Sequence, residues 1–264
     1  MNDEEVRPRQ RFLALDTATA VMAASLLEGS KVTGEVNVQG ERNHSVHVIT
    51  ELERLLSDAG VSGRDITGLA VGVGPGSYTG VRIAVTAAKT LAWAWKVPVA
   101  GVSTLHALAW GGWAHGQTGL GDKSVPLQAS AVQWIIPLLD ARRGQVYTGL
   151  FAANGEQAPV RMEQDGIRLM TSWVEELKRR LTDTDEGSRP RVLWFVGETG
   201  VHAQTAAGLE AQAAVQVVPY ELEGGWVGRL GADRLLNGEQ DELHTLVPNY
   251  TQLAEAEANL LRQR

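Results

Sequence analysis

Cysteine is absent from the 264-residue chain, so disulfide bonds, thiolate metal sites and a thiol nucleophile are excluded together. Long apolar runs are absent as well. No segment approaches the about 18 to 20 uninterrupted apolar residues that a membrane-spanning helix needs. These absences fit a reducing compartment, and we expect a cytoplasmic protein with no membrane attachment.

Basic side chains are in the minority, with 24 Lys and Arg against 31 Asp and Glu and a net charge of −7. A chain that held nucleic acid by itself would usually carry a basic stripe. The notable basic clusters are Arg142-Arg143, in a predicted hairpin turn, and Lys178-Arg179-Arg180, on a predicted helix face. Solvated charge is the ordinary explanation for both, so we expect no tight nucleic-acid binding by the isolated chain.

Apolar residues make up 44% of the chain, which is enough for a buried core. At 264 residues, a chain usually divides its core between two domains. Residues 1–10 carry charges of both signs and are predicted to form a disordered lead, neither signal peptide nor transit peptide.

The segment from Gly72 to Arg82, GVGPGSYTGVR, joins an apolar strand (66–73) to a helix (79–95). Pro75 disfavours the helical region for the glycine before it, and Gly76 can take a positive φ at little cost. Backbone amides at such a turn can bind an anion, but no lysine stands where a P-loop would place it. Two readings stay open, a tight structural turn and a phosphate-facing loop.

The order of predicted elements occurs twice. In the first half, an antiparallel meander of three strands (12–19, 20–27 and 31–38) precedes an amphipathic helix. The second half has a similar order of elements: a β-rich run at 135–151, a helix at 171–181 and a strand at 192–200. Asp16 and Asp140 are 124 residues apart, as are Gly76 and Gly200. We therefore expect two α/β lobes, at 1–108 and, smaller, at 109–264. The Gly-rich segment 110–130 predicts a surface loop, and 224–237 predicts a helix.

Candidate ligand residues follow the first strand and the Gly-Pro-Gly turn: Asp16, Thr17, Gly74 and Gly76. Asp and Thr also satisfy nearby backbone amides in turns, which is the competing interpretation for Asp16 and for Asp140. Histidines show no convincing ligand spacing, because the pair His44 and His47 lacks a third ligand. The sequence thus predicts no metal site and no catalytic residue.

The helix at 79–95 is apolar on nearly all sides and rich in small residues, so it needs cover on more than its sheet side. The helix at 44–59 could provide that cover within the lobe. Alternatively, both helices present a joint surface to a partner, forming a four-helix interface.

Four segments, FLALDTAT, GVGPGSYTGVRIAxxxAKxLA, GVSTLxALA and LLDARRGQVYxGLF, resemble the bacterial TsaB (YeaZ) family, strongly from Phe12 to Phe151. The tail VPNYTQLAEAEANL resembles the family's C-terminal segment more thinly. The resemblance implies a two-lobed actin-like/Hsp70-like (ASKHA) fold, each lobe a mixed sheet with flanking helices. It also implies a non-catalytic subunit that pairs with TsaD, while threonylcarbamoyl is transferred to the adenosine beside the anticodon of tRNA.

In that family the helical face pairs with TsaD, and related copies also pair with themselves through it. The contacts that we expect are Val48, Leu52, Ala84, Ala88 and Leu91. ATP and metal are expected to bind to the partners TsaD and TsaE, and not to this chain. tRNA is expected to meet the chain only within the complex. The C-terminal tail is expected to pack back on the first lobe. The alternative is a free-standing ATP-binding or hydrolytic enzyme of the same fold, although the metal-binding His-x-x-x-His pair of the TsaD relatives is missing.

Overall fold

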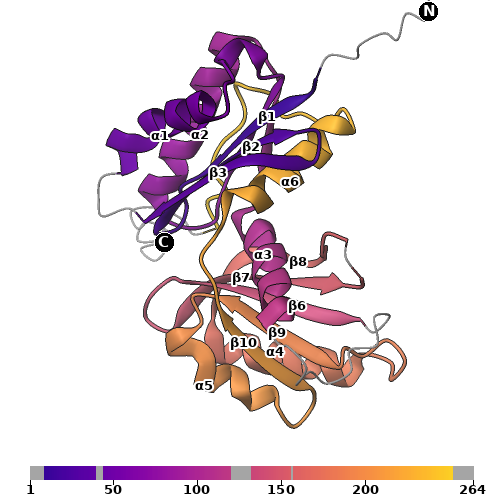
Figure 1. The fold of residues 1–264 in the computed structure, drawn as a ribbon. Helices are drawn as coiled ribbons and strands as arrows, with labels where there is room; N and C mark the ends of the chain where they lie inside the picture. Colours follow the sequence, from indigo (N-terminus) through magenta and orange to yellow (C-terminus); the bar gives the residue numbers. More distant parts are fainter. Residues whose placement is uncertain (1–8, 40–43, 120–131, 156, 252–264) are drawn as a thin grey trace, which may run out of the picture.

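The computed structural model describes residues 9–39, 44–119, 132–155 and 157–251. The chain forms two lobes, one above the other in Figure 1, and each lobe contains a five-stranded sheet.

The first sheet has the order β3-β2-β1-β4-β5. β1, β2 and β3 form an antiparallel meander, and β4 and β5 run parallel to β1. These strands are β1 (Arg11–Asp16), β2 (Val21–Glu28), β3 (Lys31–Gln39), β4 (Gly68–Gly72) and β5 (Val99–Val102).

The second sheet repeats this topology strand for strand, with the order β8-β7-β6-β9-β10, three antiparallel strands and two parallel ones. Its strands are β6 (Gln133–Asp140), β7 (Gln145–Ala153), β8 (Val160–Leu169), β9 (Val192–Gly197) and β10 (Ala214–Pro219). The predicted α/β fold of two lobes, each a mixed sheet with helices, is confirmed. The pattern analysis did not anticipate β8 and β10.

Helices cover both faces of each sheet. Alternate residues of β1 and β2 point to one core shared with α1 and α2, or to another shared with α6. In the second lobe, α4 and the short α5 lie on one face and α3 on the other. The helices are α1 (His44–Asp58), α2 (Tyr78–Trp95), α3 (Thr104–Gly119), α4 (Met170–Asp183), α5 (Ala203–Ala206) and α6 (Gly224–Leu236), with 3-10 turns at Gly63–Asp65, Gly200–His202 and Ala207–Leu209.

Two helices cross between the lobes. α3 follows the last strand of the first sheet but packs on the second sheet, whereas α6 follows the last strand of the second sheet and packs on the first. The two helices meet between the lobes (Figure 1). The rings of Trp110 on α3 and Trp226 on α6 are 5.2 Å apart. The division expected after residue 108 therefore falls inside α3, and residues 224–251 lie with the first lobe.

The prediction of a loop at 110–130 is wrong for residues 110–119, which belong to α3; the rest of that segment lies outside the described residues. Glycine indicates a loop only when close packing does not require it, and in α3 the lack of a side chain permits close packing against the second sheet. A Cβ atom on Gly112 would lie 2.6 Å from Val196, and one on Gly116 would lie 2.5 Å from the Trp194 ring. Trp113, between them, is buried and donates a hydrogen bond to Gln133.

Candidate functional site

The Gly-Pro-Gly loop lies between β4 and α2, beside the turn that follows β1. The positive φ is at Gly74 (+89°), not at Gly76 as the sequence suggested. Gly76 is required for a different reason, because a Cβ atom there would lie 2.3 Å from the carbonyl oxygen of Ala18. The loop thus packs closely against the β1–β2 turn.

Asp16 is fully buried behind this loop. Its Oδ1 accepts a hydrogen bond from the Ala18 amide and its Oδ2 accepts one from the Thr104 hydroxyl, each 2.6 Å long. A Cβ atom on Gly72 would lie only 1.8 Å from Oδ2, so glycine at that position makes the room for this carboxyl group. Burial raises the pKa of Asp16 to about 6, although both hydrogen bonds act to lower it.

The neighbouring polar groups are also used within the fold. Thr17 is buried and its hydroxyl donates to the carbonyl oxygen of Gly80, 2.6 Å away. The Ser77 amide donates to the Ala18 carbonyl at 2.7 Å, and the Ser77 hydroxyl accepts from the Gly80 amide at 3.3 Å. Of the amides around the start of α2 that could bind a phosphate, those of Ser77 and Gly80 are therefore already bonded.

These contacts favour the structural turn over the phosphate-facing loop. Asp16, Thr17 and Gly74 are buried in this arrangement, and the expectation that they bind a ligand stays a prediction. Gly76 alone of the four candidates borders an open cleft. The Gly-Pro-Gly segment is a structural turn that joins the first strand, the second helix and α3.

That cleft lies between the lobes and has a volume of about 640 Å³. Its walls come from the β1–β2 turn and the start of α2 on one side, and from the β6–β7 turn on the other. The lining residues are Ala18, Thr19, Ala20, Gly76, Ser77, Tyr78, Leu139, Asp140, Ala141, Arg142, Tyr147 and Glu198. The ionisable carboxylates on this wall, Asp140 and Glu198, outnumber its one cation, Arg142.

Asp140, like Asp16, accepts a hydrogen bond from the backbone amide two residues on. Its Oδ1 accepts from the amide two residues on, that of Arg142, at 3.2 Å, and lies 3.3 Å from Nε2 of the buried His202. Its own amide donates to Glu198, 2.7 Å away, and burial raises the pKa of the Glu198 carboxyl. Two carboxylates so close together create a negative wall that disfavours a phosphate group. In the described part of the chain, no group of three or more His, Cys, Asp or Glu is placed to hold a metal ion.

The helical face gives the second candidate site, and here the choice of residues is corrected. Val48, Leu52, Ala84 and Ala88 are only 0 to 3% exposed and pack in the core between α1, α2 and the sheet. Leu91 is half-buried against the same core. The apolar stripes were found correctly, but the pattern could not say which stripe faces the sheet.

The outward stripe of α2 consists of residues spaced at helical intervals, Arg82, Thr86, Thr90 and Trp93, all exposed. Trp93 is 71% exposed, and Ile49 on α1 is 46% exposed. A hollow of about 430 Å³ lies beside Trp93, between the end of α2 and Leu243. These are the residues of the helical face that a partner could contact.

The C-terminal tail, which was expected to lie back on the first lobe, borders this stripe. Residues 241–251, here called the strap, begin with a bridge between Asp241 and Val99 at the sheet edge. Lys89 of α2 then donates to the carbonyl oxygens of His244 and Leu246, 3.2 and 3.0 Å away. Further on, the Asn249 amide donates to the Val73 carbonyl at 2.7 Å. The described part of the C-terminal tail is thus bound to the first lobe.

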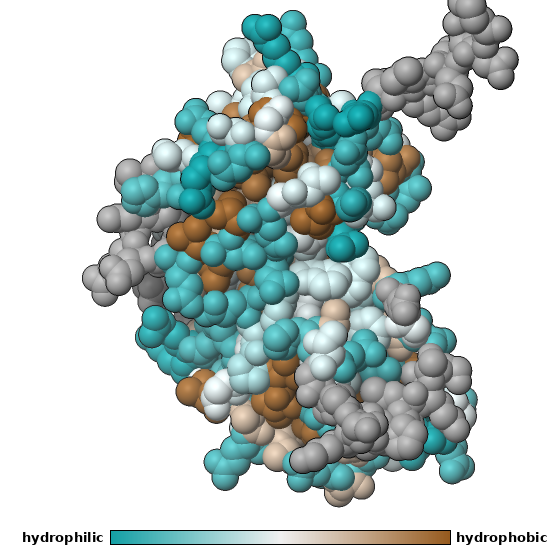
Figure 2. Space-filling model, in the orientation of Figure 1, coloured by the Kyte–Doolittle hydropathy of each residue, from teal (hydrophilic) through white to brown (hydrophobic). Residues whose placement is uncertain are grey.

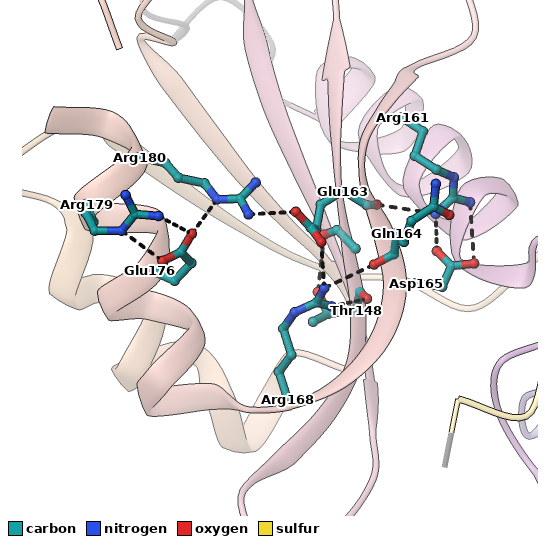
Figure 3. A network of polar contacts seen from close by, with 10 residues as sticks. Thr148, Arg161, Glu163, Gln164, Asp165, Arg168, Glu176, Arg179 and Arg180 are labelled. Carbon is teal, nitrogen blue, oxygen red and sulfur yellow. Dashed lines mark hydrogen bonds and ion pairs between the residues drawn. The ribbon is translucent and has the colours of Figure 1, made fainter. Parts of the chain in front are cut away.

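Arg179 and Arg180 of the second-lobe basic cluster pair with carboxylates of the chain. Arg179 and Arg180 bond Glu176, and Arg180 and Arg168 both bond Glu163, as Figure 3 shows. The Arg142-Arg143 pair lies in the predicted hairpin turn, where both residues have positive φ. On the side seen in Figure 2, the apolar surface is divided into separate patches by hydrophilic side chains. Among the described residues, no helix is both long and apolar enough to cross a bilayer.

Residues 32–169 match the family model described as TsaD, tRNA N6-adenosine threonylcarbamoyltransferase. The tRNA threonylcarbamoyladenosine biosynthesis protein TsaB of Bacillus subtilis is 35% identical over 261 residues, which cover 96% of this chain and 99% of that protein. The Escherichia coli protein of that name is 35% identical over 140 residues, 52% of this chain and 53% of that one. The solved structure of YeaZ from Pseudomonas aeruginosa shares the fold, with a TM-score of 0.67, 23% identity, and 91% and 99% of the two chains covered.

Proposed function

The chain belongs to the TsaB family, and from this premise we propose that it is a non-catalytic subunit that pairs with TsaD. In this proposal the chain stabilises TsaD, helps to form the surface on which TsaE docks, and supports threonylcarbamoyl transfer to the adenosine beside the anticodon of tRNA. The transfer itself takes place on TsaD, and tRNA meets this chain only within the complex, in the cytoplasm.

The observation that carries the proposal is the exposed stripe of α2, together with the neighbouring α1. A tryptophan with most of its surface in water, beside a hollow lined by Ala92, Ala94 and Val97, is an arrangement typical of a protein contact. Thr86 and Thr90, which are short, permit another helix to approach between Trp93 and Arg82. The face therefore suits a helical partner surface.

The state of the motif residues supports a non-catalytic role. Asp16 and Thr17, which stand where the nucleotide-hydrolysing relatives of the fold place a metal-proximal carboxylate, are closed inside the lobe. The inter-lobe cleft is the observation that favours the alternative, an ATP-binding enzyme, because a space of about 640 Å³ could admit a small molecule. The two carboxylates on its wall, against one arginine, argue against a triphosphate.

Pairing is tested by titrating TsaD with the full chain and with two matched variants. Thr86→Arg adds a long charged side chain on the exposed stripe and should abolish the heterodimer in gel filtration and calorimetry. Thr182→Arg adds the same side chain to an exposed position on α4 of the second lobe and should leave pairing unchanged. Equal affinity for TsaD in both variants would remove α2 from the interface.

The same titration addresses self-pairing, which is the other use of this face. If the chain is a dimer alone, added TsaD should convert it to heterodimer, because both partners occupy the α2 stripe. A homodimer that excess TsaD does not dissociate would favour a homodimeric scaffold instead.

A further inference from the structure

Arg82 is held between two tyrosines at the start of α2. Its Nε donates to the Tyr250 hydroxyl at 2.9 Å, and its Nη2 donates to the Tyr78 hydroxyl. The guanidinium carbon lies 3.8 Å from the centre of the Tyr78 ring and 5.6 Å from that of Tyr250, and the two rings are 5.5 Å apart. All three side chains are exposed. The guanidinium group is therefore oriented but still in contact with solvent.

The charge of Arg82 is not matched by a carboxylate among the described residues, where its hydrogen bonds go only to phenol oxygens. Other arginines of the chain do have such partners: Arg161 pairs with Asp165, Arg180 with Glu163, and Arg234 with Asp241. Two of the five guanidinium N–H donors bond the tyrosine hydroxyls, and the remaining donors on Nη1 and Nη2 form a fork that suits an oxyanion with two oxygens. The cluster is thus arranged to receive an anion from outside.

The strap is what holds the second tyrosine in place. Lys89 and the Val73 carbonyl bind it on either side of Leu246, which is buried in the first-lobe core. Tyr250 therefore reaches Arg82 from a segment 168 residues away in sequence. Loss of the strap contacts would leave the guanidinium group held by Tyr78 alone.

We propose that Arg82, oriented by Tyr78 and by Tyr250 of the strap, binds a carboxylate side chain of the partner protein. This inference rests on the proposed pairing with TsaD and deepens it. Arg82 lies on the same outward stripe of α2 as Thr86, Thr90 and Trp93, so a protein that covers Trp93 continues onto Arg82.

A carboxylate is favoured over an RNA phosphate on electrostatic grounds. The chain has a net charge of −7, and the cleft wall that adjoins Tyr78 carries Asp140 and Glu198. An extended polyanion would meet repulsion from both, whereas a single carboxylate on a protein surface need not approach them. The protein partner is therefore the occupant that the surroundings admit.

The test is the dissociation constant of the full chain for TsaD, measured by calorimetry for the wild type and four variants. Arg82→Gln, which removes the charge, should weaken pairing about 30-fold, as the loss of a hydrogen-bonded interfacial charge does. Arg82→Lys should recover only part of this, because lysine lacks the fork. Tyr250→Phe, which removes one orienting hydroxyl, should weaken pairing less than Arg82→Gln.

The matched control is Arg229→Gln on α6. Arg229 is also an exposed arginine beside an aromatic ring, 5.5 Å from that of Trp226, but α6 lies on the opposite face of the sheet. Its substitution should leave affinity unchanged. The difference between wild type and Arg82→Gln should also shrink as salt is added, because the contact is ionic.

The outcomes separate this inference from the proposed function. If Thr86→Arg abolishes pairing while Arg82→Gln retains wild-type affinity, pairing stands and the role of Arg82 is refuted. If the wild type does not bind TsaD at all, both fall. If Arg82→Gln pairs normally but the assembled complex loses affinity for tRNA, the anion is an RNA phosphate and the carboxylate is ruled out.

Discussion

The hydroxyl group of Thr104 links two parts of the motif region, donating to Asp16 Oδ2 at 2.6 Å and accepting from the amide of Gly74 at 3.1 Å. Asp16 ends the first strand of one lobe, and Thr104 begins α3, which packs on the other lobe. The buried carboxyl group therefore ties the Gly-Pro-Gly loop and the inter-lobe helix together instead of facing a ligand.

The first prediction concerns the pH dependence of stability. The pKa of Asp16 is raised to about 6 in the folded chain from 3.8, so between these values the folded state binds more protons than the unfolded state. The contribution of Asp16 to the free energy of unfolding is thus fully present below about pH 4 and is lost as pH rises through 6, by about 3 kcal/mol in all. Urea denaturation from pH 4 to 7 should show this loss in the wild type and not in Asp16→Asn. Parallel curves for the two proteins would contradict it.

The second prediction separates the two sides of α2. Ala88→Arg places a charge in the core beneath the helix, where Ala88 is 3% exposed, and should destabilise the first lobe by about 3 kcal/mol or more. Thr86→Arg, two residues earlier and exposed, should change the free energy of unfolding by less than about 0.5 kcal/mol. Thermal unfolding followed by circular dichroism measures both. A stable Ala88→Arg protein would mean that α2 does not pack on the sheet as described.

The third prediction concerns α6, whose glycine residues allow it to pack closely against the first sheet. A Cβ atom on Gly231 would be 2.1 Å from that of Ala70, so Gly231→Ala should destabilise the chain by about 1 to 3 kcal/mol despite the higher helix propensity of alanine. Gly200→Ala, where the added atom meets nothing within 4 Å, is the matched control and should be near neutral. Denaturant midpoints that fall equally in both variants would show that contact with Ala70 is not the cause.

The fourth prediction is that the isolated chain does not bind ATP with Mg²⁺ saturably. Asp140 and Glu198 face the inter-lobe cleft, and the Ser77 and Gly80 amides around the start of α2 are bonded within the protein. Equilibrium dialysis with labelled ATP should give no saturable uptake at micromolar protein. Saturable binding that Asp140→Asn changes would favour the free-standing enzyme.

Much of the fold could be predicted because local patterns sufficed. Alternation and turn residues gave the β1–β3 meander, and the apolar periodicity of residues 79–95 gave α2 almost to its ends. The spacing of Asp16 and Asp140 indicated a repeat, and the structure shows the two aspartates each accepting from the amide two residues on. A repeated order of elements and a repeated spacing of residues can be found in the sequence alone, without knowledge of how the side chains pack.

The rest depended on contacts that no local pattern contains. The glycines of α3 were misread as loop residues because the neighbours that require them, Val196 and Trp194, are about 80 residues away. The buried stripe of α2 was misassigned to a partner because two of its faces are apolar, and only the position of the sheet decides between them. The tail was expected on the first lobe, but its contact with α2 could not be predicted, since Arg82 and Tyr250 share no sequence signal that connects them.

The central claim is that this chain is required by its partner and acts through the exposed stripe of α2. The experiment is to measure tRNA modification in a system of purified TsaD, TsaE and the remaining proteins that the reaction needs, with and without this chain. The account predicts that threonylcarbamoyladenosine forms only when the wild-type chain or Thr182→Arg is added, and that Thr86→Arg does not restore it. A yield that is the same without the chain would contradict the account.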